Sequence, residues 1–384
     1  MDFRTTNSPE GRRVLAEQLA RLFHERADEV DKQGKFPFEN FNILMETGYT
    51  TLTVPKEYGG MDISLLELIQ LQEILAEGDG STALAVGWHM GIIKNLSEKR
   101  PWKEEVFRKV CEHTLKHGSL INSAASEKST GSPTRGGKPQ TVAVKTGEVW
   151  RLTGRKIFTT LSPVLDFVLV SASLEGRDEA GTFLVPMNTP GVSIEETWDS
   201  ISMRGTGSHD LVLQDVEVND EQLVETASGN KAPNGWLLHI PACYLGIASA
   251  AQTYAISFAK SYSPNSINGT ISEIPTVRQR IGEMELLLMQ SRHFLYSVAR
   301  KWDESNEETR SGMLPELNAA KMSVVNTAQK IVDLAMRVVG ASSLSQSNPL
   351  QRYYRDVRAG LHNPPMDDMT IQVLAASALN SKGS

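Results

Sequence analysis

The sequence contains very little cysteine: Cys111 and Cys243 are the only two among 384 residues. Two cysteines so far apart cannot build a disulfide framework or a cysteine-based zinc site, and their scarcity fits a reducing compartment. Long apolar runs are also lacking. No window approaches the 18 or so uninterrupted apolar residues of a membrane span, and the charged N-terminus does not resemble a secretory signal. We therefore expect a cytoplasmic protein without a membrane span.

An excess of positive charge is absent as well. Lys and Arg number 39 against 46 Asp and Glu, which gives a formal net charge of −7 and a pI near 5.7. A nucleic-acid footprint needs a basic face, so this balance argues against a nucleic-acid partner. The chain also lacks a GxGxxG segment after a strand, a GxxxxGK[ST] loop and an HExxH pair. His113 and His117 lie four residues apart but have no third ligand nearby, so we expect no metal site.

The hydrophobic pattern divides the chain into three parts. Apolar residues recur at helical spacing up to Gly118, and short β-branched blocks such as 141–144 and 167–170 follow between Ser119 and Val218. Helical spacing returns after a polar linker, as in Ile281, Met284, Leu288, Leu295 and Val298. This order predicts an α+β multidomain fold with a helical domain over 1–118, a β-barrel or sandwich over 119–232 and a four-helix bundle over 233–384.

Some boundaries within these parts can be predicted from local signals. Ser81 is a plausible N-cap for a small-residue helix that runs through His89. Pro101 is expected to open the next helix. Thr153-Gly154 predicts a turn inside the stretch from Trp150 to Leu161, which on general grounds indicates a β-hairpin.

The end of that stretch has a second interpretation. Phe158-Thr159-Thr160 places an aromatic ring beside two hydroxyls, and such a set can cover and hold a flat heteroaromatic cofactor. Two further segments support this interpretation. The loop Ser123–Ser132 is rich in hydroxyls and backbone donors that can bind a pyrophosphate, and Met203–Asp210 is a glycine-rich turn that leads into a strand.

Taken together, the motifs resemble those of the acyl-CoA dehydrogenase superfamily of flavoproteins. The similarity covers nearly the whole chain. It rests on six motifs in order: Val54–Gly60 ("VPxxYGG"), Ala125-Ser126-Glu127 with Gly131-Ser132 ("TEPxxGS"), Leu152–Lys156 ("LxGxK"), Phe158–Thr160 (aromatic-x-T/S), Met203–Ser208 ("MRxTxS") and Arg355–Arg358 ("RDxR").

The resemblance implies a bound flavin, usually FAD with FMN as the alternative, in a homotetramer or homodimer. Ala124, Ala125 and Ser126 would then face the pyrimidine side of the flavin ring, and Ser132 would reach the pyrophosphate. An electron-transferring flavoprotein is the usual partner of this family, and an acyl-CoA thioester is the usual small-molecule substrate.

The same resemblance assigns Phe158-Thr159-Thr160 to the flavin ring. Phe158 would cover the ring, and Thr160 would donate near N5, where a hydride arrives. The protein would position N5 and tune its electronics, while the flavin carries the redox chemistry.

The departures from the family pattern concern the catalytic base and one loop that reaches a neighbouring subunit. The family's glutamate lies about eight residues after the Asp of RDxR, and in this chain Pro364 stands there. The alternative base position falls in Trp236–His239, which has no glutamate either. The family's RxxFG loop, whose arginine reaches a neighbouring subunit's FAD, is replaced by Ser263–Gly269, where Arg278 could substitute.

The segment Leu361–Pro365 is closer to the superfamily's flavin-dependent monooxygenases, which take reduced flavin from a partner reductase and place a histidine here. That histidine would be His362, with His89 in a comparable N-terminal place. A histidine can exchange a proton with a phenolic substrate near neutral pH. The alternative interpretation of both residues is structural.

The resemblance favours one function and leaves two alternatives. The first is dehydrogenation of the CH–CH group of an acyl-CoA with hydride transfer to flavin N5, for which His362, Asp367 and Asp368 are the candidate catalytic residues. The second is a two-component monooxygenase of an aromatic or heteroaromatic compound. The third is a non-catalytic flavin or acyl-CoA binder. Fold similarity alone does not choose among them.

Overall fold

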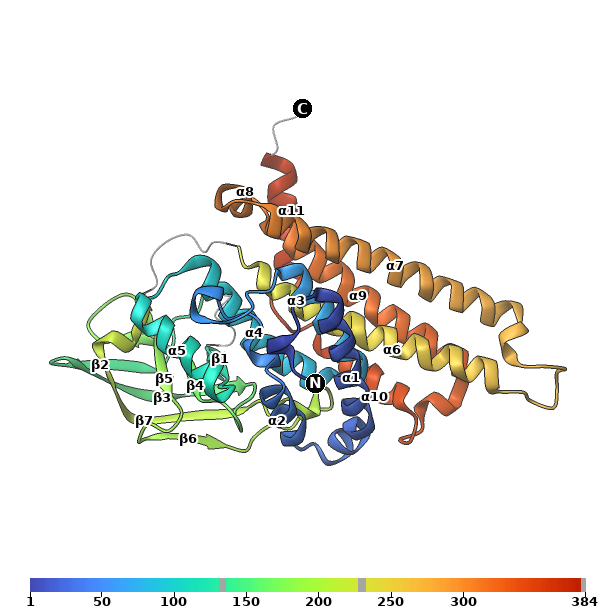
Figure 1. Ribbon diagram of the computed structural model, residues 1–384, viewed down its shortest axis with the longest axis horizontal. Coiled ribbons are helices and arrows are strands. Elements are labelled where there is room, and N and C mark those ends of the chain that lie inside the picture. Colours follow the sequence, from blue (N-terminus) through green and yellow to red (C-terminus); the bar gives the residue numbers. More distant parts are fainter. Residues whose placement is uncertain (131–135, 227–232, 381–384) are drawn as a thin grey trace.

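The computed structural model describes residues 1–130, 136–226 and 233–380, and it has the three-part architecture expected from the sequence. Figure 1 shows the sheet at one end of the molecule, the C-terminal helices at the other and the N-terminal helices between them. Buried apolar side chains from all three parts contact one another in one continuous core. The expected fold class is thus confirmed, while the domain boundaries after residues 118 and 232 stay predictions.

The N-terminal part consists of five helices. They are α1 (Pro9–Gln33), α2 (Phe38–Glu46), α3 (Leu65–Gly78), α4 (Gly80–Lys99) and α5 (Glu104–His117). Helix α4 contacts both strand β1 and helix α6, so it links the sheet to the C-terminal bundle.

Three expected helix boundaries were wrong. The N-cap of α4 is Asp79 and not Ser81, because the Asp79 carboxylate accepts the backbone N–H groups of Ser81 and Thr82 at 3.3 and 3.0 Å. The helix also continues past His89 to Lys99. Helix α5 starts at Glu104, three residues beyond Pro101.

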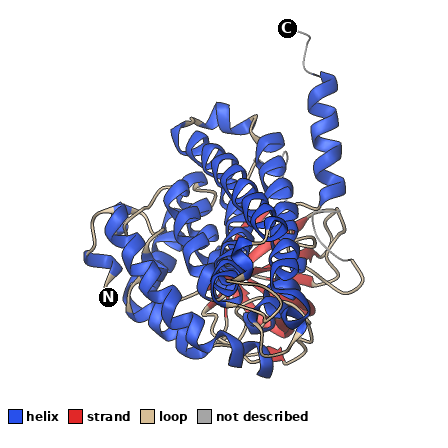
Figure 2. Ribbon diagram, turned by 90° about the vertical axis from the view of Figure 1, so that its right-hand side faces the viewer, coloured by secondary structure: helices blue, strands red, loops and turns tan. Residues whose placement is uncertain are grey.

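The middle part is one continuous sheet in the order β6-β7-β3-β2-β4-β5-β8, with β1 added beside β4. Its strands are β1 (Ile121–Ala124), β2 (Val142–Thr146), β3 (Val149–Thr159), β4 (Phe167–Leu174), β5 (Ala180–Pro186), β6 (Val192–Glu195), β7 (His209–Asn219) and β8 (Leu223–Thr226). Most neighbours are antiparallel, and β1 and β2 each pair with β4 in parallel. In Figure 2 the sheet lies behind the helices when the molecule is viewed from the bundle end.

The expected turn at Thr153-Gly154 is wrong, because β3 runs without interruption from Val149 to Thr159. The strand is bulged between Leu152 and Gly154. A Cβ at Gly154 would lie 2.4 Å from Thr141 Oγ1, so the glycine serves the close approach of a neighbouring segment and not a turn. The hairpin turn lies instead between β2 and β3, where Gly147 has a φ of +65°.

The C-terminal part is a helical bundle. Its helices are α6 (His239–Ser261), α7 (Pro275–Glu304), α8 (Glu307–Ser311), α9 (Leu314–Val339), α10 (Pro349–Ala359) and α11 (Asp367–Asn380). Helices α6, α7, α9 and α10 form the packed bundle, while Figures 1 and 2 show α11 projecting from it. Among the described helices, none combines the length and the apolarity that crossing a bilayer requires.

Candidate functional site

Three segments that lie far apart in the sequence meet at the end of β3. The carbonyl oxygen of Ser126 accepts the N–H of Ile157 at 2.9 Å, which attaches the Ala124–Ser126 segment to β3. On the other side, the N–H of Leu161 donates to the carbonyl oxygen of Thr206 at 3.1 Å. The segments 124–126, 158–160 and 203–208 therefore form one surface, which we call the platform.

The side chains of the platform fit a flat, polar ring system. Phe158 has a φ of +59° and is 61% exposed, so its large apolar ring is turned outward instead of entering the core. The Thr160 hydroxyl is hydrogen-bonded to the Ser208 hydroxyl at 2.8 Å and remains half-buried. Next to it, the buried Thr159 hydroxyl has no hydrogen-bond partner in the described part of the chain. An outward aromatic face beside hydroxyl donors is what a flavin ring requires.

The sequence did not single out Trp198, which also belongs to this edge. Its ring lies edge-to-face with Phe158, with the centroids 6.1 Å apart and the planes at 88°. Its indole N–H donates to the Met203 carbonyl oxygen at 3.3 Å, so the ring is fixed to the turn 203–208. Two aromatic rings thus meet at the exposed edge of the platform.

Of the other residues predicted to bind the cofactor, Ala124 is buried at the end of β1, and Ala125 and Ser126 are partly exposed beside it. The predicted pyrophosphate contact Ser132 lies outside the described residues. The placement of Ala125, Ser126, Phe158 and Thr160 in one surface is compatible with their predicted roles, whereas the side chains of Ala124 and Thr159 are buried beside it. All of these roles stay predictions.

A buried ion pair supports the platform from inside the sheet. Lys156 Nζ donates to Glu127 Oε1 at 2.6 Å, and the two side chains are 0% and 3% exposed. Burial by itself raises the pKa of Glu127. The hydrogen bonds from Lys156, from the Thr141 hydroxyl and from two backbone N–H groups together outweigh burial and lower the pKa to about 2. Glu127 directly follows Ser126, so the pair attaches the loop of the platform to β3.

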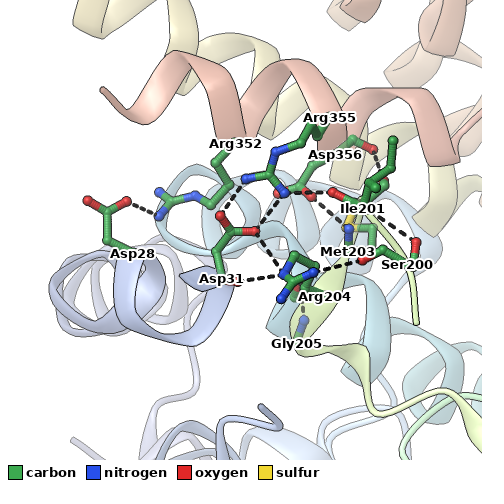
Figure 3. A network of polar contacts seen from close by, with 12 residues as sticks. Asp28, Asp31, Ser200, Ile201, Met203, Arg204, Gly205, Arg352, Arg355 and Asp356 are labelled. Atoms are coloured by element: carbon green, nitrogen blue, oxygen red, sulfur yellow. Dashed lines mark hydrogen bonds and ion pairs between the residues drawn. The ribbon is translucent and has the colours of Figure 1, made fainter. Parts of the chain in front are cut away.

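The turn 203–208 is held from the bundle side by the RDxR segment of α10. Asp356 Oδ1 accepts the N–H of Met203 at 2.7 Å, and the Ser202 hydroxyl donates to the Asp356 carbonyl oxygen at 3.2 Å (Figure 3). Burial is the largest influence on the Asp356 carboxyl and raises its pKa to about 7, against the N–H of Met203 and nearby arginines.

Charged groups around Asp356 connect this turn to helix α1. Arg355 pairs with Asp31 at 2.9 Å and also donates to the carbonyl oxygen of Ile201 at 2.6 Å. Arg204 donates to the Asp31 carbonyl oxygen at 2.6 Å, and Figure 3 shows the guanidinium groups converging on Asp31. The RDxR motif therefore holds the turn 203–208 in position. The turn places Ser208 where its hydroxyl bonds to that of Thr160.

The structure supports the structural interpretation of His89. Its Nδ1 accepts the N–H of Ile121 at 3.1 Å, and its Nε2 lies 2.9 Å from the carbonyl oxygen of Thr50. Burial lowers its pKa to about 4, so the ring is neutral and bridges the N-terminal helices to β1. Both ring nitrogens are therefore used by the backbone.

The three predicted catalytic residues lie on the segment that follows α10. His362 is exposed in the loop 361–366, and Asp368 is exposed in the first turn of α11. Asp367 is half-buried and accepts from Asn326 of α9 at 2.8 Å. This segment is connected to the platform through Asp356 of α10, and the three residues do not themselves belong to the platform surface.

A second histidine, which sequence reasoning named only as part of a segment without glutamate, is buried where the bundle meets α4. His239 is 0% exposed, and neither of its ring nitrogens has a hydrogen-bond partner among the described residues. Its ring lies parallel to Trp236, with centroids 5.8 Å apart, and edge-to-face to Trp88 at 5.0 Å. Burial lowers its pKa to about 3, so it is a neutral donor and acceptor.

Glycines on one face of α4 make room for these rings. A Cβ at Gly87 would lie 2.3 Å from His239 Nδ1, and one at Gly91 would lie 2.3 Å from the Trp236 ring. Gly80 faces the same side, next to Met203 of the turn. Seven residues of helix separate Gly80 from Gly87, so His239 lies roughly 10 Å along α4 from the platform. The spacing of these glycines is the signal that could have indicated the cluster.

Comparison with known proteins agrees with this geometry. Residues 10–99, 122–216 and 238–363 match the N-terminal, middle and C-terminal domain models of acyl-CoA dehydrogenase. The chain is 52% identical over 366 residues to the Bacillus subtilis (strain 168) protein named "Putative acyl-CoA dehydrogenase YdbM", with 95% of each chain covered. This chain belongs to the acyl-CoA dehydrogenase family.

Two solved structures of the family's fold illustrate its breadth. FMN-bound TdsC from Paenibacillus sp. A11-2 has a TM-score of 0.87 at 23% identity and covers 97% of this chain and 98% of its own. Butyryl-CoA dehydrogenase from Megasphaera elsdenii has a TM-score of 0.84 at 21% identity and covers 99% and 100%. At such identities the likeness establishes the fold alone. The expectation of a flavin cofactor, FAD with FMN as the alternative, is confirmed at the level of the family.

Proposed function

We propose that this member of the acyl-CoA dehydrogenase family is a flavin-dependent monooxygenase that acts on a small molecule. The observation that carries the proposal is the chemistry of the segment after Asp356. Its residues 357–366 present His362 but no carboxylate, and Trp236–His239 also lacks one. A dehydrogenase must remove an α-proton with a base next to the flavin, whereas an oxygenase has no such need.

The platform would hold the flavin ring. Phe158 and Trp198 would cover its face, and the Thr160 hydroxyl would donate to its polar edge. Because Thr160 is bonded to Ser208, and the turn that carries Ser208 is bonded to Asp356, this donor is fixed before any ligand binds, which lowers the entropic cost of binding. When bound, the reduced flavin supplies two electrons to molecular oxygen, of which one atom enters the substrate and the other leaves as water.

The wall facing the substrate would be formed by the cluster on α4. Trp88, Trp236 and the neutral His239 pack against one another about two helical turns from the platform. Apolar walls of this kind exclude water from a reduced flavin, and this protects oxygen chemistry from unproductive side reactions. His362, on the exposed loop, would exchange protons with solvent.

Flavin binding is the first test of the proposal. We expect the purified protein to bind FMN or FAD, and Phe158→Ala and Thr160→Val each to weaken the flavin roughly 10-fold through loss of stacking or of one hydrogen bond. Thr153→Val is the matched control, because this threonine is exposed on the same strand and its hydroxyl is bonded to Asp215, away from the platform. A wild-type protein that binds neither flavin would remove the catalytic proposals altogether.

A second candidate function is the dehydrogenation of an acyl-CoA, with Asp367, Asp368 or His362 as the base. The similarity to YdbM supports it, since that relative carries an acyl-CoA dehydrogenase name. Anaerobic addition of an acyl-CoA panel to the flavin-loaded protein separates the two. We expect the flavin absorbance to persist, together with oxygen uptake when a flavin reductase and a substrate are present. Bleaching by any acyl-CoA would establish the dehydrogenase instead.

The remaining expectations about partners follow from these alternatives. A monooxygenase would depend on a flavin reductase, and a dehydrogenase on an electron-transferring flavoprotein. The homotetramer or homodimer stays a prediction, which is supported by Leu286 and Met289 of α7, both more than half exposed. A cytoplasmic location and an acyl-CoA substrate also stay predictions. Oxygen uptake that never exceeds background with any substrate would favour the third alternative, a flavin binder without catalytic activity.

A further inference from the structure

A buried lysine lies in the bundle, outside the platform and outside the α4 cluster. Lys321 of α9 is 1% exposed, and its Nζ has no hydrogen-bond or ion-pair partner among the described residues. Burial lowers its pKa to about 8, and the carboxylate of Asp367 opposes that change. A buried ammonium group without a partner is costly, so its retention indicates a ligand group that hydrogen-bonds to it.

Two further polar groups lie on α11, which packs against α9. Asp367 Oδ1 is buried and has no partner among the described residues, although Oδ2 accepts from Asn326 of α9 at 2.8 Å. Thr370, one turn further along α11, is 0% exposed, and within the described part of the chain its hydroxyl also lacks a partner. Lys321 thus offers donors, Asp367 offers an acceptor, and Thr370 offers both.

The charges of these groups restrict the ligand that they can accept. Lys321 and Asp367 do not form an ion pair with each other, but the electrostatic influence of Asp367 reaches the lysine. An anionic ligand would be repelled by the carboxylate, and a cationic one by the ammonium group. A neutral hydroxyl can accept from Lys321 and donate to Asp367 at the same time. It would complete both hydrogen bonds without adding a charge.

The position of the three residues connects them to the platform. A Cβ built on Gly360 would lie 2.6 Å from Val325 of α9 and 2.9 Å from the ring of Tyr244, and the Tyr244 hydroxyl donates to Asn363 at 2.5 Å. Gly360 is four residues after Asp356, and Lys321 is four residues before Val325. Asp356 and Lys321 therefore each lie about one helical turn, or roughly 6 Å, from the point where α10 and α9 meet.

We propose that Lys321, Asp367 and Thr370 form a binding site for a neutral hydroxyl group of the small-molecule substrate at the junction of α9 and α11. The loop 361–366, which carries His362 and Asn363, leads directly into α11 at Asp367 and is partly exposed. The assignment of the hydroxyl to the oxidised molecule rests on the proposed function. The binding site itself does not depend on the flavin.

The test uses three small probes with the full-length protein. Phenol has a hydroxyl that donates and accepts, anisole has only the acceptor, and benzoate carries a negative charge. Their dissociation constants are measured by saturation-transfer NMR, once with FMN-loaded and once with flavin-free protein. Failure of FMN to bind would contradict the proposed function while leaving the phenol measurement intact.

We expect phenol to bind at least 10-fold more tightly than anisole or benzoate. Neither of these two probes can donate a hydrogen bond to the Asp367 carboxylate, and a hydrogen bond to a charged group is thereby lost. Lys321→Met and Thr370→Val should abolish this preference. Lys330→Met, at an exposed lysine of the same helix, should preserve it. Methionine is uncharged and similar in length, so Lys321→Met should fold at least as well as the wild type. If it does not fold, Thr370→Val carries the test.

Three outcomes would overturn the proposal. Equal affinities of the wild-type protein for phenol and anisole, including no binding of either, would mean that the three groups do not recognise a hydroxyl. Tighter binding of benzoate would indicate an anion site. A phenol preference that survives both Lys321→Met and Thr370→Val would place the phenol elsewhere in the protein.

Discussion

Replacing Glu127 by glutamine removes the charge that neutralises the buried ammonium group of Lys156. The carboxylate accepts from Lys156 at 2.6 Å, from the Thr141 hydroxyl at 2.7 Å and from the Gln140 and Thr141 N–H groups at 2.6 and 2.9 Å. The amide oxygen of the glutamine can still accept from Lys156, as the Ser171 hydroxyl does at 3.2 Å, but no negative charge remains to balance the ammonium group. Breaking a buried pair from one side leaves an uncompensated charge, which costs about 3–5 kcal/mol.

The pKa of Glu127 gives an independent magnitude. Lowering it from its usual 4.5 to about 2 corresponds to about 3 kcal/mol of stabilisation of the folded state. Because the folded-state pKa is the lower one, this contribution is present above the usual pKa and is lost as the pH falls from about 5 towards 2. Burial lowers the pKa of Lys156 despite its partner, so the lysine alone is unfavourable in this position.

Urea unfolding of the wild type, Glu127→Gln, Lys156→Met and the double variant measures the contribution of this ion pair to the free energy of unfolding. We expect Glu127→Gln to lose about 3–5 kcal/mol of unfolding free energy at neutral pH, and the double variant with Lys156→Met to recover most of it, because no buried charge is left. Glu127→Gln should also weaken the flavin, since Ser126 precedes it directly. A loss below about 1 kcal/mol, or a double variant as unstable as the sum of the single ones, would refute the reasoning.

Two further predictions concern the turn 203–208 and the α4 cluster. The Asp356 pKa of about 7 lies above its usual 3.8. Its contribution to the free energy of unfolding is therefore full below about pH 4 and is lost as the pH rises through 7. Asp356→Asn should remove this pH dependence in unfolding measurements at a series of pH values. An unchanged pH dependence would contradict the assignment. Gly91→Ala should lose about 1–3 kcal/mol of unfolding free energy, because the new Cβ would lie 2.3 Å from the Trp236 ring. Gly282→Ala on α7, where nothing lies within 4 Å, should instead gain up to about 1 kcal/mol, and equal effects at both sites would exclude crowding as the cause.

Much of the architecture could be predicted because its signals are local. Helical spacing of apolar residues indicated the first and last parts, and β-branched blocks indicated the sheet. The boundaries of α4 and α5 were less predictable, since Asp79 and Ser81 are both good caps and only the folded chain shows which one accepts the free N–H groups. The turn expected at Gly154 failed for a related reason, because a glycine required by the approach of Thr141 has the same sequence signature as a turn.

The sequence by itself determined the family pattern and the polar and aromatic residues of the platform, since motifs such as Phe158–Thr160 are contiguous. Only the tertiary structure decided how the other functional candidates are used. His89 is bonded to the backbone on both sides, His362 is exposed, and Lys321 is buried with no partner among the residues that the structure describes. These differences arise from contacts with segments tens to hundreds of residues away. No local pattern records which hydrogen bonds of a side chain those segments will satisfy.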